Sequence, residues 1–247
     1  MLTRPPWVEF DEPARRQIRY VWDDTRVPRD FRGDAGPVVG ASMQMSLRAR
    51  MGLCVGLYEW IIWRFEHMHG RQEPVQILEA AWCATVDPRY LRFFELPRSQ
   101  WLGPVEGPLW CAATWLQPAM SQGHLFPKTV YDALSFLTRL ALHVLPDTDR
   151  FNPWLRAILA RLIEIYPDQP ADPFTDLFDR QVRTRLGPLI GRNTLDPALP
   201  PNPLVTRQFL ADVLSDARGT GNPFLANSGD LADVGFVGQP YVLPPDP

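Results

Sequence analysis

The stretch LCVGLYEWIIWRF, residues Leu53–Phe65, decides the fold of this 247-residue chain. It is apolar on nearly every face, and it lies within a proline-free segment that extends from Ser42 to about His69. A helix that is apolar all round belongs at the centre of a bundle. Gly52 and Gly56 are four residues apart, which favours close internal packing against a neighbouring backbone. The segment therefore predicts a central helix surrounded by other helices.

Amphipathic segments elsewhere in the chain predict the surrounding helices. Their apolar residues recur at i, i+3, i+4 and i+7, the spacing of a one-sided helical stripe. Several segments follow an Asx-Pro pair, in which the Asx side chain caps the helix and proline takes the first helical position. The pairs are Asp87-Pro88, Asn152-Pro153, Asp172-Pro173 and Asn202-Pro203. Helices are expected over 152–166, 172–186, 202–217 and 130–144, with a shorter one over 13–22.

No convincing period-2 strand pattern competes with these helices, so the fold class is all-α: a multi-helix orthogonal bundle around the central apolar helix. We expect an N-terminal arm with a short helix over residues 1–41 and a helical body over 42–218. A C-terminal tail follows over 219–247. The tail is rich in proline and glycine, which favours an extended, polyproline-like conformation.

The charge composition excludes a strongly electrostatic nucleic-acid binder, since 25 basic residues face 28 acidic ones. The arginines of 180–192 lie close to acidic residues and are interpreted as a solvated helix face: Arg180, Arg183, Arg185 and Arg192. Lys128 is the only lysine, against 24 arginines. A GC-rich bacterial genome explains this bias most simply, and avoidance of lysine modification is the alternative.

The sequence predicts a cytoplasmic protein that does not enter a membrane. No apolar stretch reaches the roughly 20 residues of a bilayer span, and the first residues lack the apolar core of a signal peptide. The cysteines are odd in number and lie in apolar surroundings, which argues for reduced, buried thiols. They are Cys54, Cys83 and Cys111.

Phosphate and metal motifs were also sought in the sequence. The glycine-rich stretch 33–40 is not followed by Gly-Lys-Ser/Thr, so we interpret it as a loop leading into the central helix. His67 and His69 are two residues apart and point away from each other on a helix, and Gly70 after them predicts a helix C-cap. The cysteines are 28 and 29 residues apart, with no Cys-x-x-Cys pair. We therefore expect neither a metal site nor a cofactor.

Two side chains raise the question of catalysis. Cys111 could pair with His124 or His143, but a cysteine buried beside tryptophan has a raised pKa and little nucleophilicity. Glu59 is a carboxylate on an apolar helix and must find a donor, for which Arg64 and Arg92 are the expected candidates. A functional pocket lined by Glu59 is the alternative to this structural pairing.

Aromatic and apolar residues outside the predicted helices are the candidate binding residues, because aromatic side chains dominate interface hot spots. Tryptophans in predicted loops are either exposed contacts or lids over the bundle. Apolar residues of the tail are expected to anchor it to this chain or to a partner. The predicted binding residues are Trp7, Trp101, Phe224, Leu225, Phe236, Tyr241 and Leu243.

These observations favour a non-catalytic helical protein that binds another protein through its surface and tail. Plausible settings are accessory, immunity, defence or secretion components of a bacterial system. One alternative is an enzyme with a pocket between helices, using Glu59, His67, Cys83, Cys111 or His143. A second alternative is a self-associating structural component, that is, a homo-oligomer.

Overall fold

A computed structural model of the chain describes residues 2–11, 16–27, 29–31, 33–169, 186–219 and 221–244. Within these ranges the regular structure is helical, and β-pairing is limited to two isolated bridges. The all-α prediction is therefore confirmed. The α-helices are α2 (Gly36–Ser42), α3 (Leu47–Arg64), α4 (Glu73–Val86), α5 (Gly103–Gln122), α6 (Pro127–Val144), α7 (Phe151–Ile165), α9 (Pro203–Gly219) and α10 (Ser228–Asp233).

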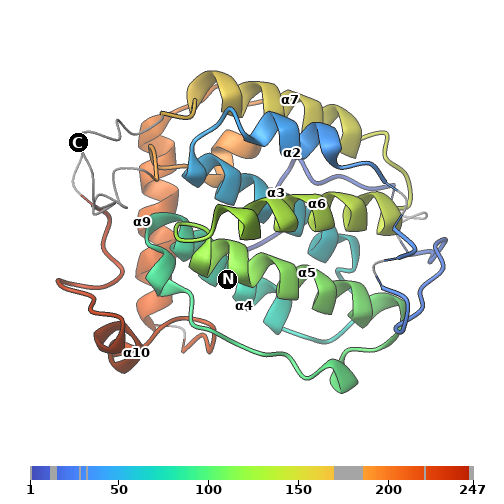
Figure 1. The fold of residues 1–247 in the computed structure, drawn as a ribbon, viewed down its shortest axis with the longest axis horizontal. Coiled ribbons are helices and arrows are strands. Elements are labelled where there is room, and N and C mark those ends of the chain that lie inside the picture. The colour runs from blue at the N-terminus through green and yellow to red at the C-terminus, as the bar shows by residue number, and fades with distance from the viewer. Residues whose placement is uncertain are drawn as a thin grey trace.

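The central element is α3, which packs against α4, α5 and α6. Every residue from Arg48 to Arg64 is buried. Figure 1 shows α5 and α6 running side by side, with α2 between α6 and α7, while α9 crosses at one end of the molecule. The predicted orthogonal arrangement around an apolar helix is confirmed. Among the described helices, none combines the length and apolar composition that a bilayer span requires.

The central helix is shorter than the proline-free segment that predicted it. It begins after Ser46, whose side chain accepts a hydrogen bond from the Ala49 amide at 3.4 Å. Residues 36–42 form α2, where the sequence predicted a loop, because Pro37 occupies a first-turn position at which no backbone donor is needed. At the other end α3 stops at Arg64, so the C-cap predicted at Gly70 is wrong.

The Asx-Pro pairs cap helices less uniformly than predicted. Asn202 does cap α9, accepting from the amide of Leu204 at 3.0 Å. Asp87 caps only a 3-10 turn, η1 (Pro88–Tyr90), by accepting from the amide of Arg89 at 3.1 Å. The pair at Asn152 lies inside the first turn of α7, which begins one residue earlier without a side-chain cap. The helix predicted after Asp172 falls in 170–185, outside the described residues.

The short helix predicted over 13–22 is wrong for its described part, because residues 16–22 contain no helix. Side chains of the bundle bind the backbone of this segment instead. The Gln17 carbonyl accepts from Arg64 at 2.7 Å, and the Val21 carbonyl lies 3.0 Å from Nε2 of His143. The backbone groups thus find tertiary partners in place of the i to i−4 bonds of a helix.

The extended conformation predicted for the tail is not confirmed, because residues 228–233 form α10. Asn227 begins this helix with a capping box. Its side chain accepts from the amides of Gly229 and Asp230 at 2.8 and 3.1 Å, and the Asp230 carboxylate accepts from the Asn227 amide at 3.0 Å. This reciprocal capping stabilises a helix in a segment too polar to form a core alone.

Gly52 and Gly56 of α3 allow close packing, as predicted. The segment that packs against them, 190–195, contains the 3-10 turn η3 (Arg192–Leu195). A Cβ at Gly52 would lie 2.6 Å from Cδ1 of Ile190. A Cβ at Gly56 would lie 2.9 Å from Cδ1 of Leu195 and 3.2 Å from the ring of Trp154. A larger residue at either position would therefore require the side chain of Ile190 or Leu195 to shift.

Gly56→Ala is expected to destabilise the fold by about 1–3 kcal/mol, the usual cost of overpacking. Relief by ring movement is restricted, because Nε1 of Trp154 donates to the Leu195 carbonyl at 2.8 Å. The matched control is Gly40→Ala in α2, where a Cβ meets no atom within 4 Å. It should be neutral or stabilising by up to about 1 kcal/mol through helix propensity. Urea unfolding measures both, and equal effects would contradict the close packing at Gly56.

Candidate functional site

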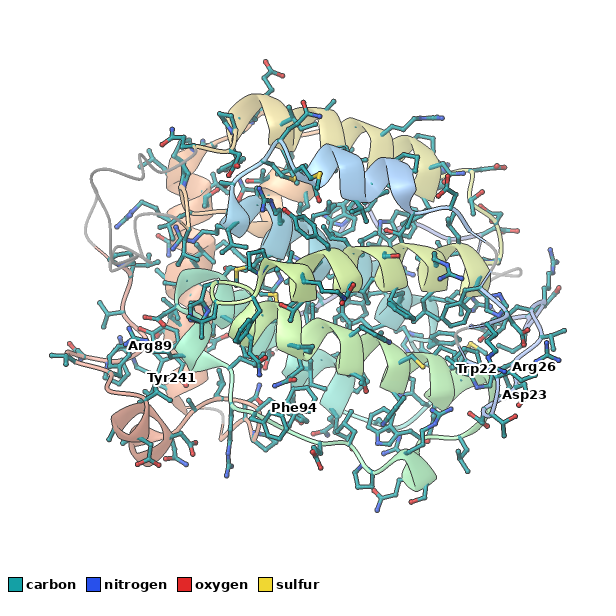
Figure 2. The ribbon with its side chains drawn as sticks, in the orientation of Figure 1. Trp22, Asp23, Arg26, Arg89, Phe94 and Tyr241 are labelled. Carbon is teal, nitrogen blue, oxygen red and sulfur yellow. The ribbon has the colours of Figure 1, made fainter. Side chains whose placement is uncertain are left out.

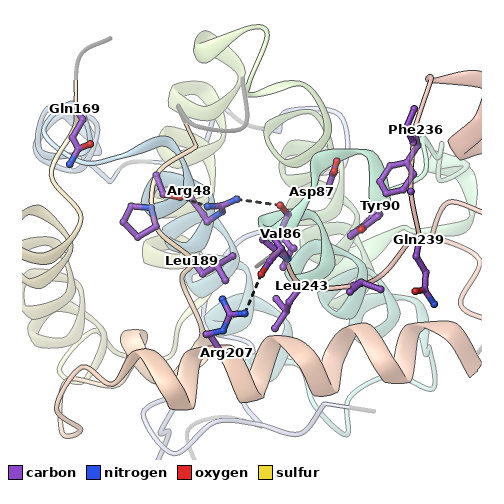
Figure 3. A pocket seen from close by; sticks show the side chains of 16 residues that line it. Arg48, Val86, Asp87, Tyr90, Gln169, Leu189, Arg207, Phe236, Gln239 and Leu243 are labelled. Carbon is purple, nitrogen blue, oxygen red and sulfur yellow. Dashed lines mark hydrogen bonds between the residues drawn. The ribbon is translucent and has the colours of Figure 1, made fainter. Parts of the chain in front are cut away.

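A pocket of about 720 Å³ lies between several helix ends and the C-terminal tail (Figure 3). The body contributes residues from the start of α3, the end of α4 with η1, the first turns of α9, and Gln169 and 187–189. The tail contributes seven of the sixteen lining residues. The lining residues are Arg48, Val86, Asp87, Tyr90, Gln169, Gly187, Pro188, Leu189, Arg207, Phe236, Val237, Gly238, Gln239, Val242, Leu243 and Pro244.

Arg48 is the most buried charged residue of this lining, with 7% of its surface exposed. Its Nε donates to the Thr85 carbonyl at 2.6 Å and its Nη2 to the Val86 carbonyl at 3.3 Å. Nη1 donates to the carbonyl of Gly187. The first two acceptors lie at the C-terminal end of α4, where helix carbonyls lack intrahelical partners. Burial lowers the pKa of Arg48 to about 10, and Asp87 opposes the shift.

Asp87 is bound in two ways by Arg89. Nε and Nη2 of Arg89 lie 2.9 and 2.7 Å from the two carboxylate oxygens, a bidentate pair. The same guanidinium lies 4.5 Å from the ring centre of Phe236 in the tail. One arginine therefore joins the end of α4 to the tail and compensates the charge of Asp87 beside the pocket.

The tail is fixed to the body by backbone pairing and by two tyrosines. The amide of Ala226 donates to the Tyr90 carbonyl at 3.0 Å, and the amide of Arg92 donates to the Phe224 carbonyl at 2.9 Å. The ring of Tyr241 stacks on Tyr90 with 4.4 Å between centroids. Its hydroxyl donates to the Ala226 carbonyl at 2.6 Å. Burial raises the pKa of Tyr241, so the hydroxyl keeps its proton and remains a donor.

The structure brings the predicted tail residues together around this pocket. Phe236 and Leu243 line it directly. Tyr241, Phe224 and Leu225 are buried against the body instead and hold the tail in place. The tail therefore contacts this chain's own surface through its aromatic residues.

The two predicted loop tryptophans act as lids over the bundle rather than as exposed contacts. Trp101 is only 2% exposed, and the guanidinium of Arg71 lies 4.0 Å from its ring centre. Trp7 is half-buried and stacks on Trp154, with 5.0 Å between centroids and 10° between planes. Both lie outside the pocket lining.

Glu59 pairs with Arg192, so the prediction that Arg64 or Arg92 would pair with it is wrong. Nε of Arg192 lies 3.0 and 3.1 Å from the two carboxylate oxygens, and Nη2 makes a further short contact. The indole N–H groups of Trp63 and Trp82 donate to the same carboxylate at 3.1 and 3.3 Å. Arg192 is thus no part of a solvated face. The other three arginines of that prediction fall in 170–185, outside the described residues.

Arg192→Leu is expected to destabilise the fold by about 3–5 kcal/mol, because it leaves a fully buried carboxylate without its cation. The matched control is Arg26→Leu, which removes an exposed pair with Asp30 and should leave stability unchanged within error. Unfolding by urea at neutral pH measures the difference. Similar stabilities for the two variants would contradict a structural role for the Glu59–Arg192 pair.

The same variant has a predicted pH dependence. Burial raises the pKa of Glu59, and Arg192 opposes that rise. Without Arg192 the folded state favours the protonated acid over a wider pH range, while the unfolded acid keeps its ordinary pKa. The stability lost by Arg192→Leu should therefore be largest near pH 8 and shrink toward pH 5. A loss that stays constant or grows on acidification would contradict this assignment.

The remaining candidate catalytic groups do not converge. His67 is exposed, whereas His143 contacts the rings of Tyr20 and Phe31 at 5.3 and 5.1 Å. Among the described contacts, no hydrogen bond joins Cys111 to His124 or His143. Over the same residues, no group of three His, Cys, Asp or Glu side chains is arranged to hold a metal ion. None of the five residues proposed for an enzyme lines the pocket.

The three cysteines are buried, and burial raises the pKa of each thiol. Because the thiolate is the reactive form, no cysteine should react with a thiol probe such as DTNB in the native protein. All three should react once urea unfolds the chain. Rapid labelling of any cysteine before unfolding would contradict the burial and would favour an enzyme with a reactive thiol.

The charged residues of the pocket were not predicted from the sequence. The sequence identified Asp87 only as a helix cap. Nothing in the sequence distinguishes Arg207 from the many other arginines. What distinguishes Arg48 is its place just before the apolar run of α3, where a charge must be buried. Chemically, the pocket offers guanidinium groups, one carboxylate and apolar walls, which suit binding.

Comparison of the chain with protein-family models, with curated proteins and with solved structures finds no match.

Proposed function

We propose that this chain is a non-catalytic helical protein that binds another protein through a surface that includes its tail. The observation that supports this proposal is that two kinds of tail residue differ in exposure. Its aromatic residues anchor it to the body, whereas its valines face solvent: Val234, Val237 and Val242 are 56, 86 and 42% exposed. Exposed apolar side chains gathered in one segment are a feature of contact surfaces.

The chemistry of the pocket supports binding over catalysis. Among the described residues that line it there is no thiol, imidazole or aliphatic hydroxyl, and Tyr90 supplies a phenolic hydroxyl. Arginines beside apolar residues are typical of protein interfaces. A bacterial setting remains part of this proposal and rests on the arginine-rich composition; no residue selects among an accessory, immunity, defence or secretion role.

The test is affinity capture from a bacterial lysate with the intact chain and two matched variants. Val237→Asp/Val242→Asp places charge on the exposed tail. The control, Val21→Asp, replaces a valine that is 77% exposed. Trp22, its neighbour in the chain, lies at the opposite end of the molecule from Tyr241 (Figure 2).

A protein captured by the wild type should be lost with the tail variant and kept with the Val21→Asp control. Its direct binding to the purified chain should then weaken about tenfold or more with the tail variant, which is typical when an interface contact worth over 1 kcal/mol is removed. Equal capture by all three proteins would reject the tail as the contact surface. Sedimentation that shows a dimer which the tail variant dissociates would favour the self-associating alternative.

A further inference from the structure

The guanidinium of Arg48 retains binding capacity at the wall of the pocket. A guanidinium carries five N–H donors, and the contacts of Arg48 with described residues use three of them, all on backbone carbonyls. The side chain is more than nine-tenths buried, so bulk water is a poor substitute for a partner. Two N–H groups on one planar fork are suited to a carboxylate.

The charge of the lining is also unbalanced in favour of an anion. Its described residues include two guanidinium groups, of Arg48 and Arg207, and one carboxylate, of Asp87. That carboxylate already has a bidentate partner outside the lining, Arg89. With Arg89 included, the described charged groups at the pocket are three guanidiniums and one carboxylate, which favours an anionic ligand over a cationic one.

Charged and apolar groups are separated within the pocket. Figure 3 shows Arg48 and Arg207 on one side and Phe236 on the other. Val237, Val242 and Leu243 from the tail extend the apolar part of the lining. The volume of about 720 Å³ falls in the range of small-molecule sites, roughly 300–1,000 Å³. A ligand with one anionic end and one apolar end matches this arrangement.

We propose that the pocket binds a small amphipathic monocarboxylate, with its carboxylate on Arg48 and its apolar chain along Phe236 and the tail. Arg207 contributes positive charge from the same side as Arg48. This ligand site shares Val237 and Val242 with the proposed protein-binding surface, but it requires no partner protein.

Decanoate is the probe, used below its critical micelle concentration with isothermal titration calorimetry on the intact chain. We expect saturable binding of one decanoate per chain. Decanol, which has the same chain without the charge, should bind at least about tenfold more weakly, the effect of losing one charge-assisted hydrogen bond. Decanol binding as tight as decanoate, or no saturable decanoate binding, would overturn the proposal.

Arg48→Gln would remove bonds that hold α4, so the variants are placed elsewhere. Leu243→Asp and Leu243→Lys replace the same half-buried apolar side chain and place opposite charges at one position. The Asp variant should bind decanoate at least about tenfold more weakly than the Lys variant. Equal binding by these two variants would show that charge does not select the ligand and would reject the proposal.

Arg207→Gln and Arg156→Gln form the second matched pair, since Arg156 is exposed on α7 away from the lining. Only Arg207→Gln should weaken decanoate binding, through the lost charge and the lost hydrogen bond to the Pro244 carbonyl of the tail at 3.1 Å, and equal effects would contradict the site. Circular dichroism and urea midpoints verify that all four variants are folded. Capture of a partner protein by Arg207→Gln at the wild-type level, together with weakened decanoate binding, would separate the ligand site from the protein-binding surface.

Discussion

The fold depends on neutralising one carboxylate at its centre. Glu59 is fully buried on α3, and an isolated charge in that position costs several kcal/mol. Its partner, Arg192, comes from a segment distant in sequence, which therefore lies across the central helix at the two glycines. Arg192 also donates to the carbonyl of Thr3, so the same guanidinium fixes the N-terminal segment. The Glu59–Arg192 ion pair thus positions two segments with little regular secondary structure, the one that carries Arg192 and the N-terminal one.

Arginine side chains also donate hydrogen bonds to backbone carbonyls at helix ends, which the planar guanidinium group can reach. Three arginines of α3 are buried, and each donates to the C-terminal end of a neighbouring helix. Arg48 binds carbonyls of α4, Arg50 binds the Ser42 carbonyl of α2 at 2.8 Å, and Arg64 binds the Val144 carbonyl of α6 at 3.1 Å. A lysine presents its three donors from one atom, so it reaches carbonyls over a shorter span than the guanidinium fork does. The lysine-poor composition therefore has a structural use here, whatever its origin.

The sequence was sufficient for the helical class, the central helix and the amphipathic helices α6, α7 and α9, because hydrophobic periodicity is local; it predicted no helix at α4 or α5. The helix predicted at residues 16–22 does not form, and the backbone there contacts Arg64 and His143 instead. The glycine-rich stretch that contains α2 was predicted to be a loop. The partner of Glu59 was also missed, since it lies 133 residues away and several arginines were equally plausible. The sequence selected the aromatic tail residues as a group. Which of them anchor the tail and which line the pocket depends on Tyr90 and Arg89, which only the fold brings near.

The stacking of Tyr241 on Tyr90 has a thermodynamic consequence for the pocket. Seven lining residues belong to the tail, so the pocket is complete only while that stack holds. Tail attachment and occupancy of the pocket are then linked equilibria. Any molecule that fills the pocket strengthens the attachment of the tail by the same factor by which the attached tail strengthens its binding. A protease that cleaves the tail after it detaches would therefore be slowed by an occupant it never touches.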